Sequence, residues 1–577
     1  MPVVLLWLAC AASAGPMAAQ GERGQAGDGS TTPSPDSAGP SATPAPGASP
    51  TPDPSASTVP LLEAAPPPEG GGTAPAGEGA AEPPLVTAPE SPGVAASGDH
   101  ERVVPQQDFV KGELSVFLGS DRVTTKKNRI GVSLGLDRIG DVYYLLLEPQ
   151  VDLRLLDRKL AIGVGVPLHF QLVDLRKATS GVGDPLQGMW ELRKVDYAQP
   201  ADFAKLLKYV TYGRKEDHLY VNIGQRYASS VGHGAVVRRY APNIDVDLTH
   251  VSAQVDAYGT YGGVELLTND IVRWNVVSGL GFVKPLAFID SLYTKSLSVG
   301  VTAAADTYAP MSLIYDNGAR TLDTDGIHLA AKRGLVALYG LDAEVKVVKT
   351  PHVDIKPYVD YSMLQGGDAG LTVGLLGRFN AGKTTVHAFR AVAELKSLGS
   401  KYVPGYFGTF YEVDRYVSRV LPPVDGVEKY LTRYEDVMSG SRPQRLGYYL
   451  EGSWGIRGGI GVTVAAEGTS DTAAKNLVAH LEVPAVDFLQ FFGSYYKRGF
   501  TDVSELGQID NRSILFAGAR LKILPILFVN GRAFKTFRMD TNVHRYENSF
   551  GFTIDVELGY EFDASSSPPP ENTPAAN

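Results

Sequence analysis

Cysteine is almost absent from the 577-residue sequence, and the single one, Cys10, lies close to the N-terminus. The rest of the chain therefore has neither disulfides nor thiol chemistry. Beyond the first 20 residues the sequence also lacks any run of about 18 apolar residues, which excludes a transmembrane helix there. The 63 glycines and 28 tyrosines favour a protein rich in strands and turns instead.

Basic and aromatic residues are scarce in residues 21–100, which hold ten acidic residues, one basic residue and no aromatic residue. Because the whole chain has 63 acidic and 53 basic residues, its remainder carries 53 acidic and 52 basic ones. The net charge of −10 therefore comes almost entirely from one segment. The nearly neutral remainder gives no electrostatic support for a nucleic-acid partner.

The two ends of the chain differ in composition from the middle. Residues 1–19 contain the apolar run Val3–Ala12 followed by small residues, which predicts a cleaved signal peptide. Leu8–Cys10 also resembles a lipoprotein box, and an N-terminus without an export role is the remaining alternative. Residues 20–107 are rich in proline and cannot bury enough apolar surface to fold, so we predict disorder there and in the tail 563–577. We expect 20–107 to be a passive linker rather than a functional tether.

Apolar and polar residues alternate from about Phe109 onward. The clearest hairpin joins Tyr143–Leu155 to Leu160–Phe170 across the turn Asp157–Lys159. Each arm has about the 9–11 residues that a tilted strand needs to cross a bilayer, whereas strands of soluble sheets usually have about 5–6. The length of the arms therefore favours a membrane barrel over a soluble sandwich.

The alternation is sharpest in the last strand, which ends at Phe562. Its apolar face consists of Phe550, Phe552, Ile554, Val556, Leu558, Tyr560 and Phe562. Its other face is small or acidic, because successive strand side chains point to opposite sides. In a membrane barrel the first face meets lipid and the second a wet lumen. We therefore expect an arginine to be tolerated better at Glu557 than at Val556.

The same alternation predicts an all-β fold over 108–562, a large antiparallel transmembrane β-barrel of roughly 16–24 strands. About 20 strands can be placed along the sequence. Long connections are expected near 172–216, 227–248, 306–326 and 398–446. Short helices are predicted near Ala201–Tyr209 and near Val427–Met438, where Asp425 and Glu428 have capping-box spacing.

The export leader, the strands of membrane length and the closing Gly559-Tyr560-Glu561-Phe562 together resemble Gram-negative, porin-like outer-membrane β-barrels. The ending is similar to the aromatic-terminated signal by which such proteins are recognised for assembly, although here 15 residues follow it. Gly405–Phe407 and Tyr411–Tyr416 also resemble uncharacterised outer-membrane proteins of myxobacteria-like bacteria. The resemblance implies a barrel in the outer membrane with both tails in the periplasm.

One nucleotide-binding motif is present, because Gly377–Thr384 matches the P-loop pattern with Lys383 in the phosphate-binding position. The residues that follow also alternate, with Phe389, Ala391, Ala393 and Leu395 opposite Arg390, Glu394 and Lys396. This pattern predicts a strand, a tight turn at Asn380–Gly382 and a second strand. We therefore expect the motif match to be accidental.

Two of the long connections carry candidate pore residues. The first contains His233, Arg238 and Arg239, and the second, 402–446, contains Arg415 and Arg419 among many aromatics. Charges at a constriction set ion selectivity, so the Arg238–Arg239 pair predicts a weak anion preference. The alternatives are solvated surface loops and, for the second connection, an aromatic surface that binds sugars.

These patterns predict a passive channel for small solutes or ions. The alternative is a non-conducting scaffold, adhesin or assembly partner, and an exported enzyme is the third class. No spacing predicts catalytic residues or a cofactor, and isolated histidines such as His250 and His352 predict no metal site. The expected partners are outer-membrane lipid and lipopolysaccharide, the barrel assembly machinery and small polar solutes. The oligomeric state is left open.

Overall fold

The computed structural model describes residues 128–562 of the chain. Within this range it leaves out 157–158, 181–182, 198–202, 204–205, 214–217, 226–227, 351, 383–386, 425–426, 457–459, 487 and 542. The predicted signal peptide, the proline-rich segment, the first 20 residues of the predicted barrel and the C-terminal tail lie outside the described residues.

The described residues form mainly long strands. The strands of the main sheet are β1 (Asn128–Ile139), β2 (Val142–Leu155), β3 (Leu160–Gly165), β4 (Leu168–Asp174), β5 (Leu207–Tyr212), β6 (Leu219–Gly224), β7 (Ser252–Tyr258), β8 (Gly262–Thr268), β9 (Val276–Val283), β10 (Ser298–Leu313), β13 (Ala331–Glu344), β14 (Val348–Lys349), β15 (Val353–Leu364), β16 (Ala369–Ala381), β17 (His387–Leu398), β20 (Arg445–Ile456), β21 (Gly461–Thr469), β22 (Lys475–Val486), β23 (Leu489–Phe500), β24 (Ser513–Leu524), β25 (Leu527–Asp540) and β26 (Arg545–Phe562).

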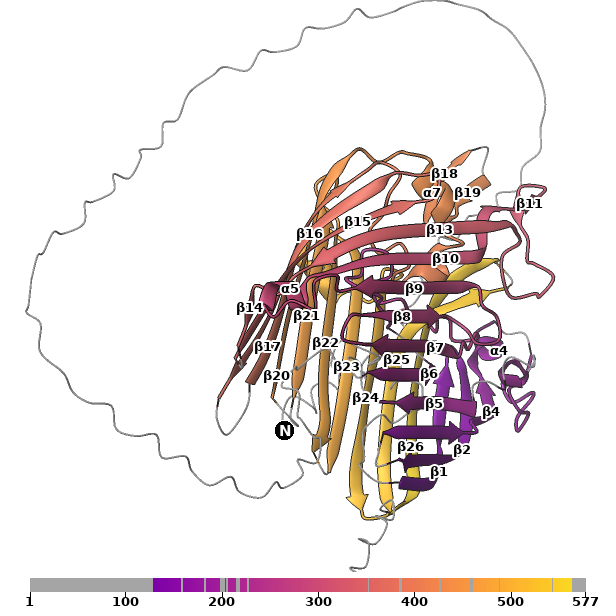
Figure 1. Ribbon diagram of the computed structural model, residues 1–577. Helices are drawn as coiled ribbons and strands as arrows, with labels where there is room; N and C mark the ends of the chain where they lie inside the picture. The colour runs from indigo at the N-terminus through magenta and orange to yellow at the C-terminus, as the bar shows by residue number, and fades with distance from the viewer. Residues whose placement is uncertain are drawn as a thin grey trace, which may run out of the picture. The chain divides into compact units, whose positions relative to one another are not determined.

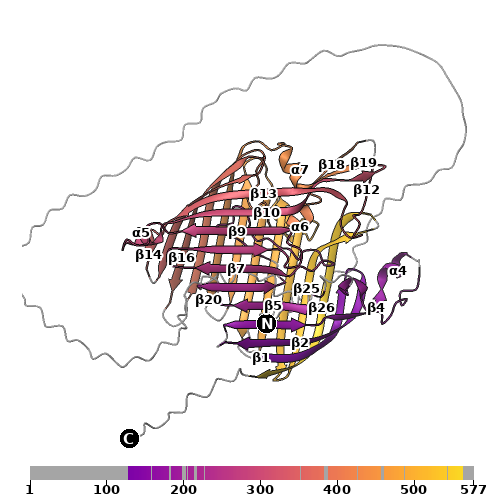
Figure 2. The same cartoon turned by 45° about the vertical axis from the view of Figure 1, so that its right-hand side comes forward.

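These strands form one antiparallel sheet that closes on itself. Each wall strand pairs with the next along the chain, and β1 pairs with β26 from Asn128↔Phe562 to Ile139↔Gly551. The 22 strands occupy 20 positions in the wall, because β3 and β4 pair in succession with β2, and β13 and β14 both pair with β15. The fold is therefore a closed 20-stranded barrel, as the alternation predicted. In Figures 1 and 2 strands β5 to β10 cross β20 to β26 in projection, as tilted strands on opposite walls do.

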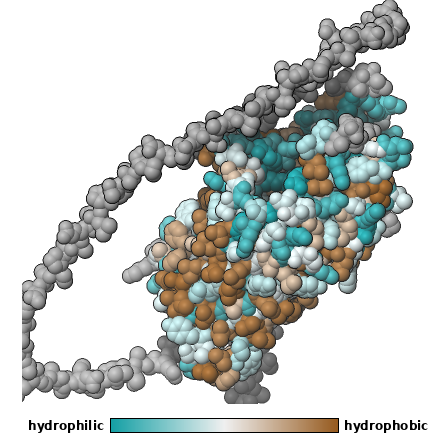
Figure 3. Space-filling view, turned by 90° about the horizontal axis from the view of Figure 1, so that it is seen from above, coloured by the Kyte–Doolittle hydropathy of each residue, from teal (hydrophilic) through white to brown (hydrophobic). Residues whose placement is uncertain are grey.

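The outer surface of the barrel is apolar and the inner surface is polar. On β26 the side chains of Ile554, Val556 and Leu558 are exposed on the outside, whereas Asp555 and Glu557 are buried inside. Strand β1 shows the same division, and Figure 3 shows hydrophobic side chains gathered over part of one face of the molecule. Large apolar side chains exposed over so many neighbouring strands need a lipid environment.

The two rims of the barrel differ in the length of their connections. At the rim where Asn128 and Phe562 pair, most connections are short turns, and the longest, residues 284–297, contains helix α5 (Leu292–Ser296). At the other rim lie the long connections 175–206, 225–251, 314–330 and 399–444. Every connection falls on alternating rims in chain order, so the barrel has a terminus rim and a loop rim.

The loop rim carries the shorter elements. They are α4 (Leu175–Ser180), η1 (Lys194–Tyr197), β11 (Tyr315–Asp316), β12 (Ala319–Arg320), α6 (Tyr411–Asp414), β18 (Arg419–Val424), β19 (Val427–Leu431), α7 (Arg433–Met438) and η3 (Val503–Gly507). Among the described residues, none of the helices is long and apolar enough to cross a membrane.

The first helix prediction is wrong where the structure describes it, and the second is confirmed only for Arg433–Met438, which form α7. Leu207–Tyr209 belong to strand β5, and Val427–Leu431 form strand β19. A capping box lies at Thr432 and Glu435, which exchange side-chain and backbone hydrogen bonds at the start of α7, whereas Asp425 of the predicted capping box lies outside the described residues. By contrast, the two strands predicted for the P-loop stretch are confirmed, because Gly377 lies in β16 and His387–Leu398 form β17. The turn between them begins later than predicted, because Asn380 and Ala381 still pair with β17. Lys383 and Thr384 lie outside the described residues.

Candidate functional site

Two connections of the loop rim fold into the interior of the barrel. The first inner segment, residues 228–250, follows β6, and the second inner segment, residues 399–418, follows β17. Most of their apolar side chains are almost completely buried. These are Ala228, Val231, Ala235, Val236, Val237, Tyr240, Ala241 and Ile244 in the first segment, and Tyr402, Tyr406, Phe407, Tyr411, Val413 and Tyr416 in the second.

The two inner segments are bonded to each other along their backbones. The N–H of Gly405 donates to the carbonyl of Ala235 at 2.7 Å, and the N–H of Arg238 donates to the carbonyl of Phe407 at 3.1 Å. Val237 and Phe407 form a parallel β-bridge. The hydroxyl of Tyr402 also donates to the carbonyl of Ala235, at 3.2 Å. The second segment is therefore built onto the first.

The inner segments reach the wall on several sides. Ile244 and Val246 exchange backbone hydrogen bonds with Phe537 of β25 at 3.1 and 3.0 Å. The hydroxyl of Tyr411 donates to Asp306 of β10 at 2.7 Å. Side chains of β8, β9, β10, β13, β15 and β17 complete one apolar cluster with Tyr240, Tyr406 and Phe407. The segments thus fill part of the interior towards the loop rim.

A cavity of about 360 Å³ lies beside the tip of the first inner segment. Its charged lining comes from that segment and from strands β8, β13, β15, β16, β17 and β20, together with connections of the terminus rim. Seven basic and six acidic side chains line it. The basic ones are Arg238, Arg239, Lys284, Lys346, Lys356, Arg378 and Arg390, and the acidic ones are Glu265, Asp342, Glu344, Asp354, Glu394 and Glu451. The cavity is therefore highly charged but close to neutral overall.

Arg238 and Arg239 lie inside the barrel, and each pairs with a glutamate of the wall. Nη2 of Arg238 lies 2.6 Å from Oε1 of Glu394, and Nη2 of Arg239 lies 2.7 Å from Oε2 of Glu451. The guanidinium of Arg238 stacks over the ring of Tyr449, with 4.0 Å to its centre. Burial alone would lower the pKa of Arg238, but Glu394 outweighs it and raises the pKa well above its usual value. Neither arginine presents an uncompensated charge to the lumen.

Each of these glutamates is shared by two cations. Glu394 also binds Nζ of Lys396 at 3.0 Å, and Glu451 also binds Arg390. In both clusters the carboxylate attracts its two cations in a medium of low dielectric constant and accepts hydrogen bonds from them. The alternation of β17 had already placed Arg390, Glu394 and Lys396 on one face, but their partners from the first inner segment lie about 150 residues away in the chain, a separation beyond any local pattern.

The other predicted pore charges lie closer to the loop rim. Arg415 is buried between Asp306, at 3.2 Å, and Glu412, at 3.1 Å. Arg419 is partly exposed and binds Asp436 of α7 at 3.0 Å. The apolar residues of the closing strand, Phe550 to Phe562, lie on the outside of the barrel, away from the cavity.

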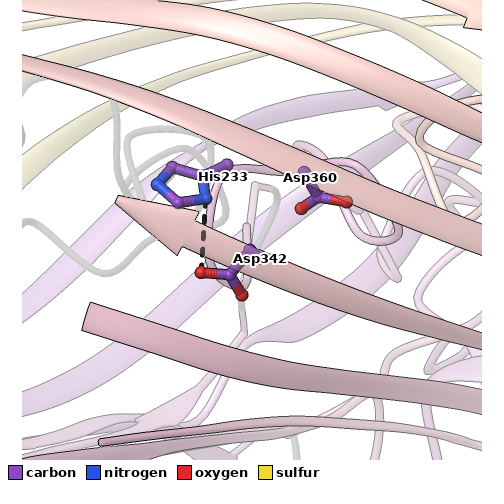
Figure 4. Close-up of side chains that lie close together, drawn as sticks. All are labelled: His233, Asp342 and Asp360. Atoms are coloured by element: carbon purple, nitrogen blue, oxygen red, sulfur yellow. Dashed lines mark ion pairs between the residues drawn. The ribbon is translucent and has the colours of Figure 1, made fainter. Parts of the chain in front are cut away.

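His233 meets two aspartates of the wall at the cavity (Figure 4). Ligand atoms of His233, Asp342 and Asp360 all lie within 4.8 Å of one another. Nδ1 of His233 lies 3.9 Å from Asp342, while its Nε2 lies 2.8 Å from Glu344. The sequence predicted His233 as a pore-loop residue but gave no sign of these partners, because they come from β13 and β15, more than 100 residues further along the chain.

A closed antiparallel barrel with an exposed apolar exterior and a charged interior defines the class of transmembrane β-barrels. No protein-family model matches the chain, and no curated protein matches it.

Among solved structures, the chain is similar to the siderophore receptor PirA from Pseudomonas aeruginosa, with 9% identity over 75% of this chain and 81% of that chain and a TM-score of 0.31. It is also similar to OccK11 from P. aeruginosa, with 10% identity, 75% and 96% coverage and a TM-score of 0.27. A third similar structure is OccAB3 from Acinetobacter baumannii, with 11% identity over 76% of this chain and 99% of that chain and a TM-score of 0.27. At these scores the class rests on the chain's own topology, and the resemblance to proteins of myxobacteria-like bacteria stays a prediction.

Proposed function

We propose that the protein spans the outer membrane with its terminus rim in the periplasm and its loop rim at the cell surface. Short turns on the periplasmic side and long loops outside are the usual arrangement of such barrels. In this orientation both tails are periplasmic and the apolar faces of strands such as β26 contact lipid and the lipid part of lipopolysaccharide. The assembly machinery would recognise the closing residues Gly559–Phe562.

We further propose that the barrel is a passive, restricted channel for small polar solutes or ions. The observation that carries this function is the charge-lined cavity of about 360 Å³ inside the barrel, bounded by the first inner segment and the wall. Loops that fold into a barrel interior narrow it, and polar groups at the narrow point select what passes. The volume favours solutes of a few heavy atoms to the size of a small metabolite.

Ion selectivity of this channel should be weak for either sign. The sequence favoured an anion preference because Arg238 and Arg239 lie side by side. In the folded chain Glu394 and Glu451 compensate both arginines, and the cavity lining as a whole is close to neutral. A near-neutral lining produces little excess of one counter-ion at the narrow point.

Conductance of the purified protein in planar bilayers tests the proposal. We expect discrete conductance steps and a reversal potential near zero in a KCl gradient. Wild-type protein that inserts and is heat-modifiable on gels, but never conducts, would contradict the channel. That result would favour the alternative of a non-conducting scaffold, which the extensive packing of the inner segments against the wall also supports.

A further inference from the structure

The tip of the first inner segment brings a histidine to two buried wall aspartates. Asp342 of β13 and Asp360 of β15 are direct partners in the antiparallel register, so their carboxylates lie next to each other. Like charges at directly opposed positions destabilise a sheet, and burial increases the repulsion. Asp342 is 7% exposed and Asp360 is 4% exposed. Within the described part of the chain, neither forms an ion pair with a lysine or arginine.

Two atoms of this cluster are buried without a hydrogen-bond partner. They are Nδ1 of His233 and Oδ1 of Asp360. Buried polar atoms of folded proteins nearly always have a partner, since leaving one unpaired costs the desolvation free energy of that group. An imidazole nitrogen and two carboxylates within 4.8 Å of one another are instead the ligand set of a divalent cation (Figure 4).

The histidine is held in the orientation that a metal ligand needs. Its Nε2 lies 2.8 Å from Oε2 of Glu344, which itself binds Lys356 at 2.7 Å. A proton on Nε2, donated to Glu344, leaves the lone pair on Nδ1, the atom that faces the aspartates. The ring also stacks on Tyr358, with 4.0 Å between centres and 5° between planes. A carboxylate behind the histidine is the usual outer partner of a metal-bound imidazole.

The backbone around His233 is built to present it. Gly232 and Gly234 both have positive φ, +57° and +82°, a region that glycine adopts without strain. This tight turn places the imidazole at the tip of the segment, at the edge of the cavity through which a hydrated ion can arrive.

We propose that His233, Asp342 and Asp360 bind a divalent transition-metal ion, which fastens the first inner segment to strands β13 and β15. One nitrogen and two oxygen ligands favour Zn²⁺ or Mn²⁺ over Mg²⁺ and Ca²⁺, which prefer oxygen alone. The ion also compensates the two opposed carboxylates. This inference does not depend on whether the barrel conducts.

The test uses the folded full-length mature chain without an affinity tag, stripped with EDTA, and Zn²⁺ as the probe. Zinc is titrated in competition with a fluorescent chelator, and the unfolding temperature is measured with and without zinc. We expect wild type to bind one equivalent that is lost in Asp360→Asn, a nearly isosteric change, and in His233→Ala. Glu344→Gln should weaken binding by about 10–100-fold, since it removes only the outer partner.

His250→Ala is the matched control, because His250 lies at the end of the same segment and its ring pairs with Asp270, at 3.3 Å. It should retain the zinc equivalent and the rise in unfolding temperature. Should Asp360→Asn and His233→Ala fold, as judged by heat modifiability, and bind zinc like wild type, the site is refuted. The site is also refuted if wild type binds no zinc.

Discussion

Among single residues, the glutamates that each bind two cations in the interior should be important for the stability of the barrel. Glu451 lies between Arg239 and Arg390, so removing its charge leaves two buried guanidiniums facing each other. Glu451→Gln should therefore destabilise the barrel by about 3–5 kcal/mol. Arg239→Met leaves a balanced Glu451–Arg390 pair and should cost clearly less. Denaturant unfolding of the refolded protein measures both, and equal losses would show that the charges are not coupled in this way.

The buried carboxyl of Asp245 should make the stability of the folded chain depend on pH. Burial, together with the neighbouring Asp247, raises the pKa of Asp245 to about 7. In the unfolded chain the carboxyl ionises at about 4, so the unfolded state releases this proton first and stability falls as pH rises from about 4 through 7. Asp245→Asn should remove this loss, with a gain of roughly 1–3 kcal/mol at pH 8 and little change at pH 4. Unfolding curves at the two pH values measure it, with the exposed Asp316→Asn as control. A gain that is equal at both values would exclude titration of Asp245 as its cause.

Among single elements, the closing strand β26 has an inner face that is more tightly packed than its sequence indicates. Glu557 is completely buried and lies between Arg129, at 3.2 Å, and Arg520, at 3.3 Å. The expectation that arginine would be tolerated there assumed a wet lumen, and it loses its basis because three guanidiniums would meet. The effect of lipid on an introduced arginine is therefore best compared between two positions on the outer face of β26.

Positions on the outer face of β26 differ in their expected depth in the bilayer. Ile554, Val556 and Leu558 lie between aromatic residues on the same face, an aliphatic centre with aromatic ends that matches the interfaces of a bilayer. Val556→Arg places a charge near the midplane and should cost about 2–4 kcal/mol, whereas Tyr560→Arg lies near the periplasmic interface and should cost about 0–1 kcal/mol. Folding into lipid vesicles under denaturant measures both. Equal costs would mean that this face does not cross a bilayer at the expected depth.

The sequence predicted the wall well, because one buried and one lipid-exposed face impose a strict period of two on each strand. The main difference is β5, because Leu207–Tyr212 is too short for a clear alternation and the sequence predicts a helix that includes its first residues, Leu207–Tyr209. Without β5 the turns cannot be assigned to alternating rims. The inner segments escaped prediction for another reason. Their aromatics pack in irregular backbone, and their partners, such as Asp306 for Tyr411, lie on distant strands.

For the whole molecule, the open question is how far the inner segments restrict the lumen. The wall does not depend on the second segment, because Leu398 at the end of β17 pairs directly with Arg445 at the start of β20. A short hairpin turn can therefore replace residues 399–444 without changing the register of the barrel. This deletion removes the second inner segment together with β18, β19 and α7.

The deletion should leave a folded, heat-modifiable barrel, because the wall closes through its own backbone hydrogen bonds. Its conductance in planar bilayers should rise severalfold, since Tyr402, Tyr406 and Tyr411 no longer fill the interior. The control replaces 314–330, the loop-rim connection between Leu313 and Ala331, which are also direct partners, and it should leave conductance close to wild type. Should both deletions raise conductance equally, the barrier lies at the rim. If the 399–444 deletion gives a folded barrel without conductance, the first inner segment and the wall side chains already close the lumen, and the protein acts as a scaffold.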